Sequence, residues 1–198
     1  MIVAISGPAA SGKGTLARLL AKTLNLNHYD FGLMFRGIAL LRQLYSEKVL
    51  QDLIVDNRLR VEQSDIWLCW VNLSSYLKSE EVGLLAARMA QSQLSEIIRL
   101  AMMLVKHSSF ICDGRTCGSE IYPNAEFKFY ITANEDERLQ RRLSQGGQQS
   151  SYLERDHLDQ NRLVIPNGAI ILNTSGKTKE DCLYELMSYL PQKLNEQS

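Results

Sequence analysis

The feature that most constrains the fold is a glycine-rich segment that follows the first hydrophobic run. Residues 2–6 (IVAIS) have the pattern of a short buried strand, and the segment GPAASGKGT occupies residues 7–15. Apolar side chains then recur at helical spacing over residues 13–25. Glycines let a backbone wrap around a phosphate group, and a helix N-terminus directs its unpaired N–H groups at that group. The segment therefore predicts a phosphate-binding loop between a strand and a helix.

The spacing G-x-x-x-x-G-K is that of a Walker A loop, in which the lysine reaches the β- and γ-phosphates of a nucleotide. Lys13 holds this position, and Thr15 supplies a hydroxyl near the metal ion. Gly14 separates the two, and the resulting GKGT is the variant seen in nucleoside-monophosphate kinases. The residues predicted to hold the phosphates of ATP are Gly7, Pro8, Ala9, Ala10, Ser11, Gly12, Lys13, Gly14 and Thr15.

A second partial match, SGKT over residues 175–178, lacks the glycine that the loop requires at its start. That position is Ile171, in the middle of a predicted strand. We expect a plain loop here, followed by a helix that Thr178 caps.

Strand and helix patterns alternate along the rest of the chain. Hydrophobic runs predict strands at residues 110–113, 127–132 and 169–173, and the short segment at residues 28–30 is expected to be a strand that leads into a helix. Two further β-like runs, residues 58–62 and 66–71, predict a small inserted hairpin. The alternation indicates an α/β domain with a parallel sheet.

The composition narrows the class further. The chain has 198 residues, and its 22 Lys and Arg residues balance 22 Asp and Glu residues. This length predicts one domain with a sizeable core, and zero net charge argues against nucleic acid or an anionic membrane as a partner. The longest apolar run is too short to span a bilayer. The four cysteines form no C-x-x-C pair, which predicts reduced thiols in a cytoplasmic protein.

Two acidic residues end predicted strands, and each is followed by an arginine. Asp30 opens the segment DFGLMFR, which ends at Arg36. Asp113 ends the run FICD, as a Walker B acid does, and Arg115 follows it. Each acid also has a simpler interpretation, because Asp30 could only cap a helix and Asp113 could only close a strand-end turn.

A third polar group lies near the end of the chain. In the segment RDHLDQNR, helical spacing places Arg155, Asp159 and Arg162 on one face. Such a face can also be a solvated ladder of ion pairs. Each of these three polar groups alone is a weak indication of function. Together, in this order after a GKGT loop, they are a strong one.

With these motifs in place, the sequence resembles the bacterial cytidylate kinases, which phosphorylate CMP and dCMP. The resemblance covers essentially the whole chain, from GPAASGKGT through D-x-G-x-x-x-R, D-G-R and R-D-x-x-D-x-x-R to the final strand. It implies a three-layer P-loop α/β fold with a five-stranded parallel sheet in one kinase domain over residues 1–198. It also implies a small nucleotide-binding insert over residues 57–78 and a short lid over residues 143–153. ATP is the implied co-substrate, Mg²⁺ the implied metal ion, and a monomer the implied state.

The same resemblance implies roles for individual residues. Charge on the transferred group is neutralised by Lys13, Arg115, Arg155 and Arg162. The acceptor nucleotide contacts Asp30, Arg36, Arg99, Arg115, Thr116, Asp159 and Arg162. Before the lid, Arg138 and Arg141 are expected at the ATP phosphates, with Arg142 as a further candidate. The metal ion is placed at Thr15 and Asp113.

The chain departs from the family pattern where the acceptor is read. Phe31 and Phe35 stand where the family has a hydroxyl residue and a tyrosine. Thr116 stands where the family has the aspartate that accepts a hydrogen bond from the cytosine amino group, and Ala90 aligns with a serine that touches the base. Missing partners at a polar base-reading site lower discrimination between bases. CMP and UMP are therefore both open as acceptors.

Two other functions compete with this one. The first is a kinase of another small acceptor, such as shikimate, but those families carry GK[ST] without the intervening glycine. The second is a non-catalytic nucleotide-binding regulator or GTPase switch, but the chain has no N-K-x-D motif and DGR is not D-x-x-G.

Overall fold

A computed structural model describes residues 1–144 and 163–190 of the chain. Its centre is a five-stranded sheet in the order β2-β6-β1-β7-β8, and every pairing in it is parallel. The strands are β1 (Ile2–Ser6), β2 (Asn27–Asp30), β6 (Phe110–Asp113), β7 (Phe127–Thr132) and β8 (Ile170–Asn173). The parallel sheet predicted from the alternating pattern is confirmed.

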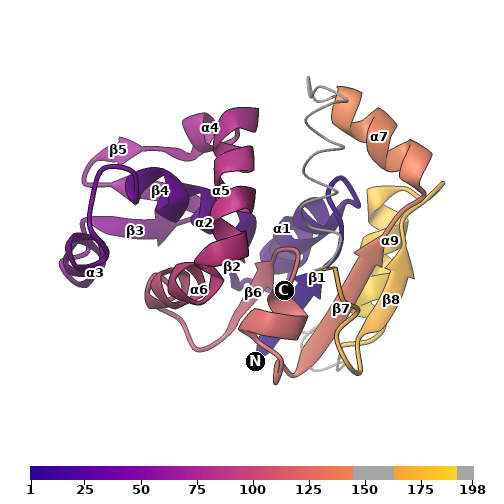
Figure 1. Ribbon diagram of the computed structural model, residues 1–198. Helices are drawn as coiled ribbons and strands as arrows, with labels where there is room; N and C mark the ends of the chain where they lie inside the picture. The colour runs from indigo at the N-terminus through magenta and orange to yellow at the C-terminus, as the bar shows by residue number, and fades with distance from the viewer. Residues whose placement is uncertain (145–162, 191–198) are drawn as a thin grey trace.

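Helices cover both faces of this sheet (Figure 1). One face carries α1 (Lys13–Thr23) and α9 (Lys179–Met187), and the other carries α2 (Phe31–Leu41), α5 (Glu80–Ser92) and α6 (Leu94–Met103). The remaining helices of the described part are α3 (Glu47–Val55), α4 (Ser74–Leu77), α7 (Glu135–Ser144) and the short π-helix η1 (Cys117–Ile121). The three-layer α/β fold is therefore as expected.

The two faces of β1 show why its residues form a central strand. Val3 and Ile5 pack into the cluster under α1 and α9, whereas Ala4 packs into the cluster under α2 and α6. Successive side chains of a strand point to opposite faces, so a strand buried on both sides reads as a continuous apolar run. Burial on both faces fixes β1 at the middle of the sheet, directly before the glycine-rich loop.

A second, smaller sheet lies apart from the first, at the left of Figure 1. It pairs β3 (Leu59–Glu62), β4 (Asp65–Leu68) and β5 (Val71–Asn72) in antiparallel order. The expected hairpin is present, but the run at residues 66–71 is not one strand. Cys69 has a positive φ of 55° and turns the chain, which separates β4 from β5.

Other helix ends follow their capping residues. Ser79 accepts a hydrogen bond from the Val82 N–H at the start of α5, and Thr178 forms a capping box with Asp181 at the start of α9. The segment at residues 175–178 is thus a loop with a helix cap, as predicted. The expected lid lies largely outside the described residues, which resume at Leu163.

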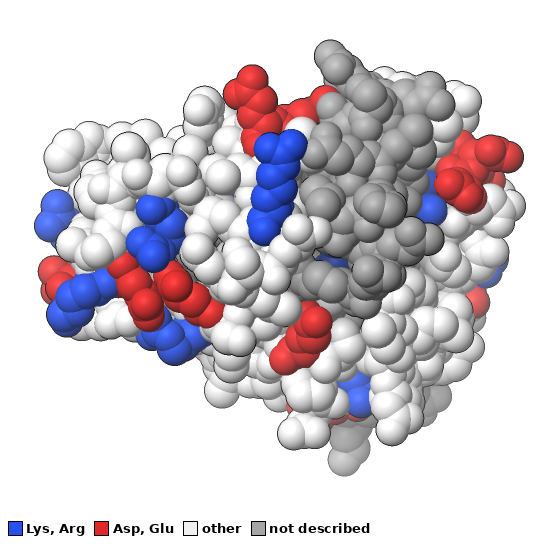
Figure 2. All heavy atoms as spheres, viewed as in Figure 1, with Lys and Arg blue, Asp and Glu red and all other residues white. Residues whose placement is uncertain are grey.

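Charged side chains of both signs are interspersed over the lobe that holds α3, on the face seen in Figure 2. Among the described residues of this face, neither sign gathers into a broad patch. Among the described helices, none is long and apolar enough to cross a membrane. The four cysteines, all within the described part, carry free thiols.

Candidate active site

A cavity of about 520 Å³ opens at the carboxyl ends of β1, β2 and β6. In open parallel sheets, ligands bind at this edge, beside the strand where the crossover direction reverses. The cavity is as large as a typical small-molecule site. Its lining brings together most of the residues that the sequence selected: Ala9, Ala10, Gly12, Lys13, Gly14, Thr15, Asp30, Arg36, Asp113, Arg115, Thr116 and Arg141.

The glycine-rich loop has a backbone that its sequence requires. Gly7 has a φ of 146°, and a Cβ atom there would lie 2.0 Å from the Ile131 carbonyl oxygen of β7. Gly12 precedes α1 with a φ of 90°, also unfavourable for an L side chain. The Lys13 ammonium donates a hydrogen bond to the Pro8 carbonyl at 3.0 Å, across the loop. The loop thus folds around its own lysine at the N-terminus of α1.

Two carboxylates lie beside this loop. Asp30 ends β2, Asp113 ends β6, and the two residues are partners in the strand register. Burial raises the pKa of the Asp30 carboxyl above its ordinary value, and the nearby Asp113 raises that pKa further. Gly14 lies next to Asp113, because a Cβ atom built there would be in van der Waals contact with Asp113 Oδ2, at 3.4 Å. One oxygen of Asp113 therefore faces the start of α1.

The residues at this edge suit a nucleotide phosphate with a magnesium ion. Ser11 Oγ is fully buried in the loop and has no hydrogen-bond partner among the described residues, an unusual state for a buried hydroxyl. Thr15 and Asp113 supply the oxygen ligands that Mg²⁺ prefers. The described residues hold no group of three or more His, Cys, Asp or Glu side chains that could hold a metal ion.

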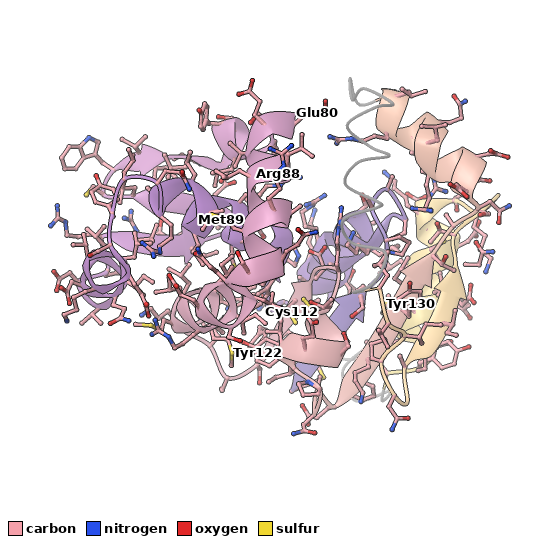
Figure 3. The ribbon with its side chains drawn as sticks, in the orientation of Figure 1. Glu80, Arg88, Met89, Cys112, Tyr122 and Tyr130 are labelled. Atoms are coloured by element: carbon pink, nitrogen blue, oxygen red, sulfur yellow. The ribbon has the colours of Figure 1, made fainter. Side chains whose placement is uncertain are left out.

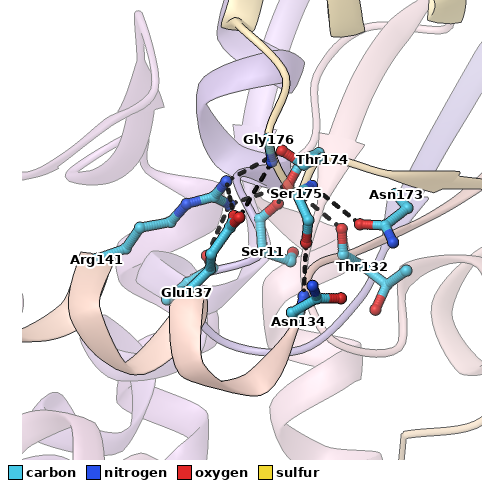
Figure 4. A network of polar contacts seen from close by, with 10 residues as sticks. Ser11, Thr132, Asn134, Glu137, Arg141, Asn173, Thr174, Ser175 and Gly176 are labelled. Carbon is cyan, nitrogen blue, oxygen red and sulfur yellow. Dashed lines mark hydrogen bonds and ion pairs between the residues drawn. The ribbon is translucent and has the colours of Figure 1, made fainter.

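The loop after β8 contacts the phosphate loop and supports it (Figure 4). Thr174 Oγ1 donates a hydrogen bond to the Ser11 carbonyl at 2.9 Å. Arg141 of α7 donates to Thr174 Oγ1 at 2.9 Å and to the Thr174 carbonyl at 3.1 Å, while Glu137 accepts from the same guanidinium at 3.0 Å. Arg138 lies beside them, and its Nη1 is 3.4 Å from the Ala9 carbonyl. Both arginines predicted for the ATP side therefore lie against the phosphate loop.

Sequence reasoning missed this loop as part of the site. Thr174, Lys177, Thr178 and Lys179 line the cavity, although the loop was expected only to connect a strand and a helix. No local pattern marks the contact, because Ser11 and Thr174 are far apart in the chain and meet only when β8 joins the sheet.

The opposite wall of the cavity is largely apolar. Phe31, Leu33 and Phe35 of α2 line it, together with Ala86, Ala87 and Ala90 of α5. Arg36 is held at the base of this wall, where its Nη1 donates to the Leu77 carbonyl at 2.9 Å. Burial lowers the pKa of the Arg36 guanidinium, although Asp30 opposes that effect. Arg115 and Thr116 close the wall on the β6 side, with Thr116 buried.

An ion pair joins α7 to α5. Arg142 of α7 lies 3.2 Å from the Glu80 carboxylate, and Glu80 begins α5 on the side toward α7 (Figure 3). Arg142 also lies close enough to Arg36 to lower the pKa of that group. Arg141 and Arg142 are neighbours in sequence, yet the first faces the phosphate loop and the second faces the apolar wall.

The structure does not bring every predicted residue to the cavity. Arg99 of α6 does not line the cavity and is paired with Glu47 of α3, so its contact with an acceptor stays a prediction. Gly7, Pro8 and Ser11 shape the loop without lining the cavity. Arg155, Asp159 and Arg162 lie outside the described residues.

Comparisons with known proteins agree with this geometry. A family model described as cytidylate kinase matches residues 3–192. A cytidylate kinase of Caldanaerobacter subterraneus subsp. tengcongensis is 35% identical over 207 residues, covering 90% of this chain and 89% of the relative. A cytidylate kinase of Clostridioides difficile is 29% identical over 211 residues, covering 95% of this chain and 97% of the relative. Among solved structures, TT1252 from Thermus thermophilus has a TM-score of 0.53 at 17% identity, covering all of this chain (100%) and 98% of the other, and supports the fold alone.

Proposed function

The chain belongs to the cytidylate kinase family, and we propose that it transfers the γ-phosphoryl group of ATP to the 5′-phosphate of CMP or dCMP, yielding ADP and CDP or dCDP. The observation that carries this is one cavity with two different walls. A phosphate loop with Lys13 forms the first, and an apolar surface that ends at Arg36 and Arg115 forms the second. A nucleotide triphosphate fits the first wall, and a base with its 5′-phosphate fits the second.

Phosphoryl transfer requires that the two nucleotides be positioned and that the charge on the transferred group be neutralised, more than it requires proton transfer. The acceptor oxygen of a nucleoside monophosphate is already anionic, so the site needs no general base. Lys13 and Arg115 line the space between the walls, where negative charge develops on the transferred group. Arg155 and Arg162 complete this set in our proposal, and Asp159 holds the acceptor ribose. When bound with ATP, Mg²⁺ neutralises phosphate charge, and Thr15 with Asp113 would hold it.

The acceptor base is the least constrained part of the proposal. Phe31, Ala90 and Thr116 all line the cavity, and none of them is a carboxylate that could accept from a cytosine amino group. Thr116 still offers a hydroxyl at this wall, which can accept one hydrogen bond. We propose CMP and dCMP as the preferred acceptors, with UMP as the nearest competitor.

An acceptor panel tests this function. CMP, dCMP, UMP, AMP and shikimate are each supplied with ATP and Mg²⁺, and ADP formation is measured. The proposal predicts the highest kcat/KM for CMP or dCMP. Turnover of shikimate alone would support a different small-acceptor kinase, and tight ATP binding with no turnover on any acceptor would support a regulator.

The proposal also covers the insert, the lid, the compartment and the oligomeric state. The small sheet and its flanks, residues 57–78, serve as the acceptor-binding insert, and residues 143–153 serve as the lid. The protein acts in the cytoplasm as a monomer, without a nucleic-acid partner. Sedimentation in the presence and absence of both substrates tests the oligomeric state.

A further inference from the structure

The buried side chain of His28 links Asp113 to the small sheet. His28 of β2 has Nε2 at 2.7 Å from Asp113 Oδ1 and Nδ1 at 2.8 Å from Ser64 Oγ. Both His28 and Asp113 are almost fully buried. Because a carboxylate only accepts hydrogen bonds, Nε2 is the donor to Asp113. One imidazole thus spans the distance between the phosphate side and a turn of the small sheet.

The turn that holds Ser64 has an unfavourable backbone. Gln63 and Ser64 form the two-residue connection between β3 and β4, with φ values of 50° and 70°. Such turns favour Asn-Gly, because both central residues need a positive φ. A serine here costs conformational energy that glycine would avoid. Ser64 Oγ also lies 3.3 Å from the His28 carbonyl oxygen, so this hydroxyl is close to both the side chain and the backbone of His28.

The two oxygens of Asp113 face different residues. Oδ1 is taken by His28, whereas Oδ2 lies toward Gly14 at the start of α1. Without the imidazole, rotation of the carboxylate about its χ2 angle would no longer be opposed at Oδ1. The hydrogen bond therefore fixes the plane of the carboxylate, with one oxygen on His28 and the other toward Gly14.

We propose that His28 is a positioning residue for Asp113: it turns Oδ2 toward the phosphate loop and, through Ser64, ties the small sheet to the same carboxylate. The proposal rests on the proposed function in one respect, that Asp113 faces a magnesium ion bound with ATP. Partners that orient metal-binding side chains commonly change metal affinity by about 10–100-fold when they are removed. His28 touches no substrate in this account and acts only through Asp113.

The test measures binding of ATP by calorimetry in the absence of any acceptor. The parent protein, His28→Gln and the control His107→Gln are titrated with ATP in Mg²⁺ and again in EDTA. His107 is a suitable control because it contacts Tyr29 at the same sheet edge and lies outside the active-site cavity. We expect His28→Gln to bind ATP about tenfold more weakly in Mg²⁺ and equally well in EDTA, with His107→Gln unchanged in both.

Loss of affinity in both conditions, or in neither, would overturn the proposal. Because no acceptor is present, this result is independent of whether CMP is the substrate. A parent protein that binds Mg²⁺ and ATP but phosphorylates no nucleotide would contradict the proposed function and leave the role of His28 intact.

A second variant keeps the proposal testable should His28→Gln fail to fold. Ser64→Gly removes the hydroxyl and relieves the positive φ, so the free energy of unfolding should be equal or higher. The proposal predicts affinity for ATP in Mg²⁺ about threefold weaker despite that stability. In a foldable His28→Gln background, Ser64→Gly should add no further loss, because the two changes break one chain of contacts. Unchanged affinity in Ser64→Gly would show that Ser64 only shapes the turn.

Discussion

Asp30 and Asp113 stand opposite one another at the carboxyl ends of β2 and β6, as partners in the register of adjacent parallel strands. Asp30 has its Oδ1 2.9 Å from the Leu33 N–H, where it caps α2. Its pKa is raised first by burial and then by the charge of Asp113, while Lys13 and the Leu33 hydrogen bond oppose the rise. Keeping the Asp30 carboxylate beside Asp113 at the phosphate loop therefore lowers the free energy of unfolding.

Replacing Asp30 with Asn should raise the free energy of unfolding at neutral pH. A carboxylate whose pKa is higher in the folded state stabilises the fold fully below its unfolded pKa, near 3.8, and loses that contribution as pH rises through the folded pKa. Asn keeps the helix cap without the charge. Relative to Asp30→Asn, the parent should therefore lose stability as pH rises above about 3.8, and the difference should level off once Asp30 is ionised.

Urea unfolding from pH 4 to 8 measures this difference. Asp52→Asn is the matched control, because Asp52 is an exposed carboxylate of α3 outside the cavity. A difference between parent and Asp30→Asn that grows toward low pH would contradict the direction of the shift.

Gly7→Ala should destabilise the protein more than any conformational preference alone explains. Its Cβ atom would lie 2.0 Å from the Ile131 carbonyl oxygen, so β7 or the loop must move. We expect a loss of about 3 kcal/mol or more in the free energy of unfolding. Gly168→Ala is the control, since Gly168 has a φ of 71° but nothing within 4 Å of the added atom. Its loss should be about 1 kcal/mol, and equal losses in the two variants would refute the close approach.

Thr116→Asp should move base preference toward cytosine. Thr116 is buried in the acceptor wall, and an aspartate there would accept a hydrogen bond from an exocyclic amino group, which uracil lacks. We expect the ratio of kcat/KM for CMP to that for UMP to rise about tenfold. Ser119→Asp in η1, outside the cavity, should leave the ratio unchanged. An unchanged or lower ratio in Thr116→Asp would show that this residue does not read the base.

Local sequence patterns predicted most of the fold because each element carries its own signal. The strands of the main sheet are short apolar runs, and Ser79 and Thr178 mark helix starts. α3 was missed although its signal is present, with Ser46 as a cap and Leu50, Leu53 and Ile54 buried at helical spacing. Because α3 was missed, the ion pair between its Glu47 and Arg99 of α6 was not foreseen either.

Other features left no local signal. The chain turns at Cys69 without a glycine or asparagine to mark the positive φ. η1 depends on the Thr116 carbonyl, which accepts from both the Glu120 and the Ile121 N–H groups. Contacts between distant segments, such as Thr174 with Ser11 or Arg142 with Glu80, exist only once the sheet and α7 are in place. The phosphate loop could be predicted because all its residues are contiguous.

The most direct test of the central claim follows phosphoryl transfer from ATP to CMP by ³¹P NMR, in the parent protein, Lys13→Met and Lys22→Met. Lys22 lies on the same helix as Lys13 and is exposed, outside the cavity. We expect ADP and CDP in equal amounts from the parent and from Lys22→Met, and no detectable CDP from Lys13→Met, since the ammonium at the phosphates is lost. Ordinary turnover in Lys13→Met, or ATP consumption by the parent without CDP, would contradict the central claim.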